Sequence, residues 1–156
     1  MKLYCMRHGQ ALPPSAEEPD PILSPQGEQE IKRLGAYLQQ KGVSVSYAFS
    51  SYKKRAKQTA ALCCEQLACL AQPEEHDLLD PTRSIDRLVA EAETWCDDTL
   101  LVGHMPHIGQ LVSQLVSKQA CYPLVRFTPG TIVCLERGEG DQWSIEWVIQ
   151  AKLLTD

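Results

Sequence analysis

The stretch that decides the fold is Lys2-Leu3-Tyr4-Cys5-Met6-Arg7-His8-Gly9, close to the N-terminus. Its apolar residues predict a buried strand over Lys2–Arg7, and Gly9 marks the loop that follows. This strand ends on an arginine and a histidine side by side. In sheets covered by helices, ligands bind beyond the carboxyl ends of the strands. We therefore expect a polar site at this end of the first strand.

Strand and helix patterns alternate along most of the chain, and two strand patterns follow at its end. Ser24 and Pro25 mark a helix start, since serine caps helix N-termini and proline fits the first turn, and Gly42 ends this helix. Further helices are expected over residues 56–70, 85–92 and 108–115, and further strands over 45–49, 78–79, 99–103, 131–135 and 143–149. The order predicts one domain over residues 1–156, an α/β protein built as a three-layer α/β/α sandwich around a mainly parallel sheet, with a C-terminal antiparallel hairpin.

Two apolar patterns make specific packing predictions. The second helix is expected to bury one stripe of side chains, namely Ala56, Ala60, Cys63, Leu67 and Leu70. The last strand is expected to place four alternating apolar side chains on one face, namely Trp143, Ile145, Trp147 and Ile149. Cys63 and Cys134 are interpreted as small core residues, while Cys64 cannot share the face of Cys63 and is expected to be partly exposed.

Composition excludes several classes of function. The 156 residues carry a net charge of −5, and no basic tract stands out that could neutralise a nucleic-acid backbone. The chain shows neither a signal pattern nor an apolar run that could span a bilayer, so we expect a cytoplasmic protein with no membrane association. Seven cysteines, an odd number with no CxxC pair, fit a reducing compartment. We expect a monomer.

Polar and basic side chains follow three of the expected strands. Arg7 and His8 follow the first, Ser50-Ser51 and then Arg55 follow the second, and Gly103-His104 follow a later one. Because parallel strands end at the same edge of a sheet, these groups can converge into a small cationic cup. Each residue also has a purely structural interpretation. A histidine after a strand is commonly a satisfied polar residue, and an arginine in a first helical turn can be merely solvated, although it opposes the helix dipole unless an anion binds there.

Two further features have competing interpretations. The loop after the first strand holds five prolines, Pro13, Pro14, Pro19, Pro21 and Pro25, and is either a stiff wall over the site or a surface crossover without function. His104 and His107 are spaced as a metal pair, but Pro106 places a helix start between them and no carboxylate or thiol accompanies them. We therefore expect no metal, and we interpret His76 and His107 as surface or boundary residues.

Several motifs together resemble the histidine phosphatase superfamily, whose fold is that of the phosphoglycerate mutases. They are Arg7-His8-Gly9, Ser51-x-x-x-Arg55-Ala56-x-Gln58-Thr59 and Gly103-His104. Leu23-Ser24-x-x-Gly27, Gly103-His104-x-Pro106-x-x-Gly109 and the short chain bring the resemblance closest to the phosphohistidine phosphatase SixA group. The group commonly has Arg-Pro where this chain has Pro21-Ile22, so the resemblance does not determine which residues form the loop side of the pocket.

The resemblance implies roles for particular residues. His8 would be the nucleophile that forms a phosphohistidine intermediate, and Arg7, Arg55 and His104 would bind the phosphoryl oxygens together with Gly9. No cofactor or metal is implied, because the arginines neutralise the charge that magnesium neutralises elsewhere. Ester-cleaving members also carry an acidic proton donor. The candidates here are Glu74, Glu75, Asp77 and Asp80, with Asp80 the best placed as a general acid, and a plain surface acid is the competing interpretation for all four.

The weakness of the acid candidates bears on the substrate. An ester expels an alkoxide that needs a proton donor, whereas phosphohistidine expels imidazole, which can leave as a neutral ring. The first hypothesis is therefore a phosphatase that acts on a phosphohistidine-bearing protein, such as a phosphotransfer domain or a phosphocarrier, and releases phosphate ion. The alternatives are a small-molecule phosphomonoesterase or mutase of the same superfamily, and a phosphate-recognition module without turnover.

Overall fold

A six-stranded sheet forms the centre of the molecule in the computed structural model, which describes residues 1–119 and 123–155. The strand order is β5-β3-β6-β1-β7-β8. The bounds of these strands are β1 Lys2–Arg7, β3 Tyr47–Ser50, β5 Glu74–Glu75, β6 Thr99–Gly103, β7 Thr131–Arg137 and β8 Trp143–Gln150. The strands from β5 to β1 are parallel to one another, and β7 and β8 are antiparallel to their neighbours. This confirms the expected mainly parallel sheet with its C-terminal hairpin.

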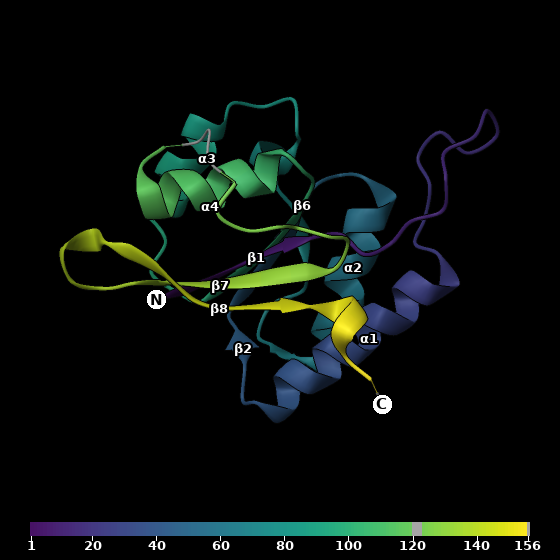
Figure 1. Cartoon of the computed structure of the whole chain (residues 1–156), viewed down its shortest axis with the longest axis horizontal. Coiled ribbons are helices and arrows are strands. Elements are labelled where there is room, and N and C mark those ends of the chain that lie inside the picture. The colour runs from purple at the N-terminus through teal and green to yellow at the C-terminus, as the bar shows by residue number, and fades with distance from the viewer. Residues whose placement is uncertain (120–122, 156) are drawn as a thin grey trace.

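Helices cover both faces of the sheet, as Figure 1 shows. The helices α1 (Pro25–Gln40) and α2 (Lys54–Gln66) pack on one face, and α3 (Ile85–Ala92) and α4 (His107–Ser117) pack on the other. Side chains of β1 alternate between the two resulting cores: Tyr4 and Met6 lie in the first, Leu3 and Cys5 in the second. All four are at most 4% exposed, as period-two alternation in a strand buried on both faces requires. The three-layer α/β/α prediction is thereby confirmed.

The start of α1 follows from its sequence. The Ser24 hydroxyl accepts a hydrogen bond from the Gly27 N–H at 3.0 Å, and Pro25 occupies the first turn. Residue 27 must be a glycine, because a Cβ there would lie 2.1 Å from the carbonyl oxygen of Gln10. The helix therefore packs directly against the loop that leaves β1.

Three element predictions were wrong in detail. The strand expected over 45–49 is broken at Ser46, whose N–H bonds the Asp98 carbonyl, and its first part, β2 (Ser44–Val45), pairs with β4 (Ala68–Cys69) in a separate small sheet. This pairing ends α2 at Gln66, so Leu70 falls off the predicted stripe and is 83% exposed. Residues 77–79 form a 3₁₀ turn capped by the His76 ring and not the expected edge strand. The edge position of the sheet is occupied by β5, which pairs with β3.

The last strand also departs from its pattern. Trp143 and Ile145 pack in the core beneath α3 and α4, whereas Trp147 and Ile149 pack in the core beneath α1 and α2. A bulge at Glu146 causes the switch, because Leu135 pairs with Ile145 while the preceding Cys134 pairs with Trp147. The alternation had predicted that all four side chains lie on one face of the strand. The structure places two of them on each face instead.

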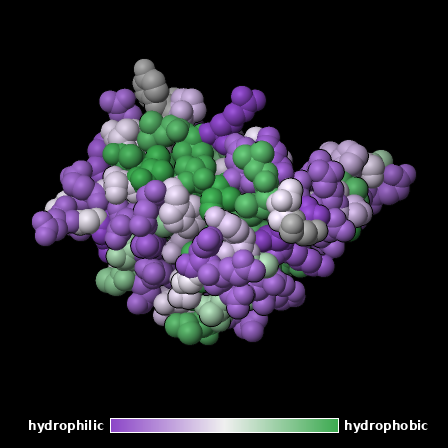
Figure 2. Space-filling view, turned by 60° about the horizontal axis from the view of Figure 1, so that its bottom comes forward, coloured by the Kyte–Doolittle hydropathy of each residue, from purple (hydrophilic) through white to green (hydrophobic). Residues whose placement is uncertain are grey.

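The proline-rich loop projects from the body of the molecule. Its base is closed by an antiparallel bridge between Ala11 and Leu23 and by a hydrogen bond from the Leu12 N–H to the Ile22 carbonyl. We call residues 11–23 the arm. Figure 1 shows it reaching out beside α1 and α2, and Figure 2 shows that its surface is mostly hydrophilic.

None of the helices in the described residues is both long enough and apolar enough to cross a membrane.

Candidate active site

Three strand ends meet at one edge of the sheet. Arg7 pairs with Gly103 across β1 and β6, and Ser50 pairs with Val102 across β3 and β6. Directly beyond these pairs, the His8 N–H bonds the Gly103 carbonyl at 3.1 Å. The rings of His8 and His104 lie with their centroids 5.0 Å apart. The convergence expected from the parallel strand order is thus present, and it places two buried histidines in contact.

The ring of His8 is held in one tautomer by its own loop. Its Nδ1 lies 2.7 Å from the Gly9 carbonyl oxygen, which can only accept, so Nδ1 carries the proton and Nε2 keeps a lone pair. The Arg55 Nε–H points at that Nε2 at 3.3 Å. Burial lowers the pKa of His8 to about 4, with smaller lowering by Arg55 and Arg7, against a raising effect of the Gly9 carbonyl. His8 is therefore neutral at pH 7 with its nucleophilic nitrogen directed at a cation.

The two arginines reach the site from different elements. Arg55 lies in the first turn of α2, where Lys53 offers no side-chain cap to the helix. Arg7 ends β1 and donates from Nη1 to the Phe127 carbonyl at 2.8 Å, while its buried Nε has no hydrogen-bond partner. Burial, and secondarily Arg55, lowers the pKa of Arg7. Both guanidinium groups remain charged at neutral pH, so the site presents two cations beside a neutral imidazole.

Gly9 and Thr59 lock the loop after β1 onto α2. The Gly9 N–H donates to the Thr59 hydroxyl at 3.0 Å, and that hydroxyl donates to the Arg55 carbonyl at 2.7 Å. A Cβ at residue 9 would lie 2.9 Å from Ile31, so the loop can pass this close only with glycine there. The Gly9 N–H, expected from the resemblance to bind phosphate, is engaged by Thr59 in this structure.

His104 has a partner that sequence reasoning did not assign. Its Nε2 lies 2.6 Å from the hydroxyl oxygen of Ser51, which is fully buried. That hydroxyl also accepts from the Lys53 N–H at 3.4 Å. The other ring nitrogen of His104, Nδ1, is buried and has no hydrogen-bond partner in the described residues. Burial, followed by His8 and nearby cations, lowers the pKa of His104 to about 3.

A carboxylate from the arm also lies at the site. Asp20 Oδ1 is 3.6 Å from Arg55 Nη1, and Asp20 Oδ2 accepts from the Lys54 N–H at 3.3 Å. Glu18 pairs with the Lys54 ammonium at 3.1 Å, and the Leu23 N–H donates to the Gln58 side chain at 2.8 Å. The arm therefore borders the site, as the wall interpretation expected, although Pro21-Ile22 replace the arginine and proline of the family pattern. Sequence reasoning had sought an acid only after Arg55 and missed Asp20.

The side chains of the four acid candidates have partners outside this constellation or, among the described residues, none. Asp80 accepts from the Thr82 N–H and hydroxyl, both at 2.9 Å, and these bonds lower its pKa. Glu75 pairs with Lys57 at 2.9 Å. Within the described residues, no hydrogen bond or ion pair joins any of the four to the histidines and arginines of the site. A lowered pKa is the opposite of what a carboxyl group needs in order to donate a proton at neutral pH.

His107 differs from its predicted surface or boundary placement. It opens α4 and is only 3% exposed, and burial lowers its pKa. His76 does lie at a boundary, where it packs against Phe49 and Trp95. In the part of the chain that the structure describes, no three side chains of histidine, cysteine, aspartate or glutamate are grouped so that they could hold a metal ion.

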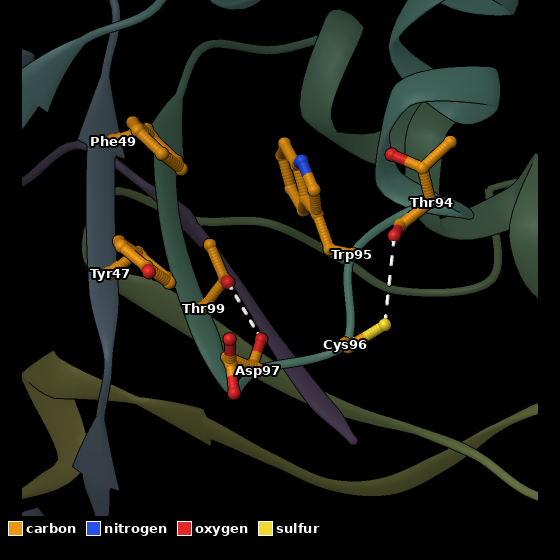
Figure 3. A pocket seen from close by; sticks show the side chains of 7 residues that line it. All are labelled: Tyr47, Phe49, Thr94, Trp95, Cys96, Asp97 and Thr99. Atoms are coloured by element: carbon orange, nitrogen blue, oxygen red, sulfur yellow. Dashed lines mark hydrogen bonds between the residues drawn. The ribbon is translucent and has the colours of Figure 1, made fainter.

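A separate hollow of ≈ 300 Å³ lies at the opposite end of the strands, near Thr99 at the start of β6. Figure 3 shows the rings of Tyr47 and Phe49 on β3 facing Trp95 across it. Its lining residues include one carboxylate, Asp97, and no cation. The hollow therefore lacks the charges that a phosphoryl group needs.

Comparisons with known proteins agree with this arrangement. A solved structure of the protein histidine phosphatase SixA complexed with tungstate superimposes with a TM-score of 0.86 at 22% identity, covering 97% of this chain and 98% of that one. An α-ribazole phosphatase from Shigella flexneri gives 0.72 at 16% identity over 96% of both chains. A phosphoserine phosphatase from Entamoeba histolytica, solved with 3-phosphoglyceric acid, gives 0.70 at 14% identity over 97% and 99%. At these identities the superpositions establish a shared fold.

Two sequence comparisons go further. An uncharacterized protein of Picosynechococcus sp. is 32% identical over 131 residues, which is 80% of this chain and 78% of the relative. The sequence pattern of the histidine phosphatase superfamily (branch 1) matches residues 3–80, half of the chain, including the segment from Arg7 to Arg55. The chain belongs to the histidine phosphatase superfamily.

Proposed function

We propose that this protein is a phosphatase that hydrolyses the P–N bond of phosphohistidine on another protein, through a covalent intermediate on His8. The observation that carries the proposal is the state of His8: its Nδ1 proton is held by the Gly9 carbonyl, and its Nε2 lone pair lies against Arg55. A buried neutral imidazole with a fixed tautomer beside two guanidinium groups suits nucleophilic attack on a phosphoryl group.

The reaction has two steps. In the first, solvent protonates the free ring nitrogen of the substrate phosphohistidine, His8 Nε2 attacks the substrate phosphorus, the P–N bond to the substrate imidazole breaks, and the imidazole leaves as a neutral ring that keeps this proton. In the second, water attacks the phosphorus of phospho-His8, the new P–N bond breaks, and phosphate is released. His8 returns to the neutral tautomer held by Gly9, because the water proton goes to the departing phosphate.

Phosphoryl binding is assigned to Arg7, Arg55 and His104, of which the two arginines supply the neutralising charge. The Arg55 Nε–H that now faces His8 would turn to a phosphoryl oxygen, and Arg7 Nε and His104 Nδ1, which have no hydrogen-bond partner in the described residues, would supply two further donors. A charge-assisted hydrogen bond contributes on the order of 1.5–3 kcal/mol. Several such bonds directed at the charge of the transition state supply a large part of the barrier reduction, because they are fixed before the reaction begins.

The choice of P–N over P–O chemistry rests on the acid. Asp80, the best-placed acid expected from the sequence, is bonded to Thr82 with a lowered pKa, so it serves poorly as a proton donor to an alkoxide. Asp20, the arm carboxylate at the site, already pairs with Arg55 and accepts from the Lys54 N–H. A phosphoimidazole needs no such donor. The close superposition on the protein histidine phosphatase SixA supports the same choice.

A second candidate is a small-molecule phosphomonoesterase or mutase of the superfamily. The superpositions on α-ribazole phosphatase and phosphoserine phosphatase favour it, and it requires an acid within reach of the leaving oxygen. A phosphate-recognition module without turnover ranks third, because His8, Arg7, Arg55 and His104 are all in place.

The partner proposed is a phosphotransfer domain or phosphocarrier that carries phosphohistidine. The test measures phosphate release from such a protein and from a panel of phosphate esters, with wild type and His8→Ala and no added metal. The proposal expects turnover of the phosphohistidine, lost in His8→Ala. Preference for the esters would instead establish the small-molecule enzyme, and binding without turnover would establish the recognition module.

A further inference from the structure

Asp20 is the one arm residue whose side chain reaches the proposed phosphoryl site within the described residues. Its Oδ1 is buried without a hydrogen-bond partner, and the cation beside it is Arg55 Nη1 at 3.6 Å. Its Oδ2 accepts the Lys54 N–H at 3.3 Å, at the start of α2. The carboxylate therefore bonds to the two groups that would attract a phosphate, namely the guanidinium and the positive end of the helix.

The arm holds this carboxylate in place. Pro19 and Pro21 flank Asp20 and fix the backbone φ on both sides of it. The ion pair of Glu18 with Lys54 anchors the arm before Asp20, and the bond of the Leu23 N–H to Gln58 anchors it afterwards. Asp20 is thus tied down from both directions, and its charge stays at the site when a ligand arrives.

One guanidinium separates this charge from the proposed nucleophile. Arg55 directs Nε at His8 Nε2 and Nη1 at Asp20, so a phosphoryl group on His8 would share Arg55 with the carboxylate. With both histidines neutral, Arg7 and Arg55 supply two positive charges, and Asp20 cancels one of them. The remaining charge at Arg7 and Arg55 favours one phosphoryl group, and a second anionic group beside Arg55 would meet the Asp20 carboxylate.

We propose that Asp20 determines the charge of the accepted substrate: it disfavours small phosphorylated acids, which carry a carboxylate near the phosphoryl group, and favours a phosphoryl group on a neutral ring. This inference rests on the proposed function, since it assumes that the phosphoryl group binds at His8. It assigns to Asp20 a role in selectivity by repulsion, and it explains how a site built on arginines can discriminate against other anions.

The test compares two ligands in a background without turnover. Dissociation constants of 3-phosphoglycerate, which has a second anionic group, and phenyl phosphate, which has none, are measured by calorimetry for His8→Ala and for His8→Ala combined with Asp20→Asn. Removal of one like charge is expected to tighten 3-phosphoglycerate binding about tenfold, and phenyl phosphate binding by no more than about threefold. The matched control is His8→Ala combined with Glu17→Gln, which removes a charge from an exposed residue of the same arm and should leave the ratio of the two constants unchanged.

Other results would overturn the inference, and they identify what has failed. Equal tightening of both ligands would mean that Asp20 competes with phosphate without selecting substrates. Equal weakening would mean that Asp20 only positions Arg55. If neither variant binds either ligand while both keep the wild-type circular dichroism spectrum, the proposed phosphoryl site itself is wrong and the inference falls with it.

Discussion

The two ends of the parallel strands are built from different chemistry. At the carboxyl ends, His8, His104 and Ser51 are buried together. Arg7 precedes His8 in the chain, and Arg55 donates to the His8 ring. At the amino ends, Tyr47 and Phe49 stack with ring planes 5° apart and face Trp95 across a hollow of ≈ 300 Å³. The first edge concentrates buried polar groups, which are costly to keep, whereas the second concentrates aromatic rings, which are not.

This difference supports placing the proposed phosphoryl site at the carboxyl edge of the sheet. Burial keeps both histidines neutral, with pKa values of about 4 and about 3, and within the described residues Arg7 Nε and His104 Nδ1 are buried at the carboxyl edge without a hydrogen-bond partner. Such groups lower the stability of a protein unless a ligand uses them. The lining residues of the aromatic hollow include no cation that could hold a phosphoryl group.

Removal of His8 tests most directly whether the carboxyl edge of the sheet carries the proposed activity. We expect His8→Ala to lower kcat on a phosphohistidine protein by at least about a thousandfold, because the nucleophile is lost. The matched control is His76→Ala, which removes a histidine that packs against Trp95 near the aromatic hollow. That control should keep kcat within about twofold, and a similar loss in both variants would show that the effect is structural.

Arg55→Gln removes one positive charge from the carboxyl edge and tests how much that charge contributes to the reaction. We expect kcat/KM to fall about 10²- to 10³-fold, the size seen when one transition-state donor is removed. The pKa of His8, followed by NMR titration, should rise from about 4 while staying below 6.5, because burial is its largest cause and Arg55 is a smaller one. A His8 pKa that does not move would contradict the placement of Arg55 against His8.

The buried histidines should also make stability depend on pH. The unfolded chain binds a proton on each histidine near pH 6.5, whereas folded His8 does so only near pH 4. Stability is therefore complete above pH 6.5 and falls as the pH drops toward 4, with His8 contributing on the order of 3 kcal/mol. Urea denaturation at several pH values measures this. His8→Gln should flatten the curve in that window, and an unchanged slope would contradict the burial account.

The smallest effect is expected from Ser51→Ala, which removes the partner of His104 Nε2. The ring would keep a buried nitrogen without a hydrogen bond, at a cost of about 1–3 kcal/mol in unfolding free energy. We expect kcat/KM to fall about 10- to 100-fold, because the His104 ring loses the hydrogen bond that orients it. Ser51→Thr, which keeps the hydroxyl, should recover part of the activity, and its failure to do so would argue against the hydrogen bond as the cause.

The sequence predicted the parts of the site that lie at strand ends. Arg7-His8 and Gly103-His104 directly follow strongly apolar strands, so their meeting follows from parallel order alone. Asp20 and the Ser51–His104 bond were not predictable in this way, because they depend on how the arm returns to α2 and on a side-chain contact across 53 residues. The tryptophan pattern of β8 failed for a local reason, since one bulge residue turns half of the strand over.

The most direct test of the account is to trap the phosphoenzyme. The protein is mixed with a phosphohistidine-bearing substrate labelled on phosphorus, quenched in alkali, which preserves phosphohistidine, and mapped by mass spectrometry. The account predicts transient label on His8 that is lost in His8→Ala. Turnover with no labelled enzyme at any quench time, or with label on a residue other than His8, would contradict it.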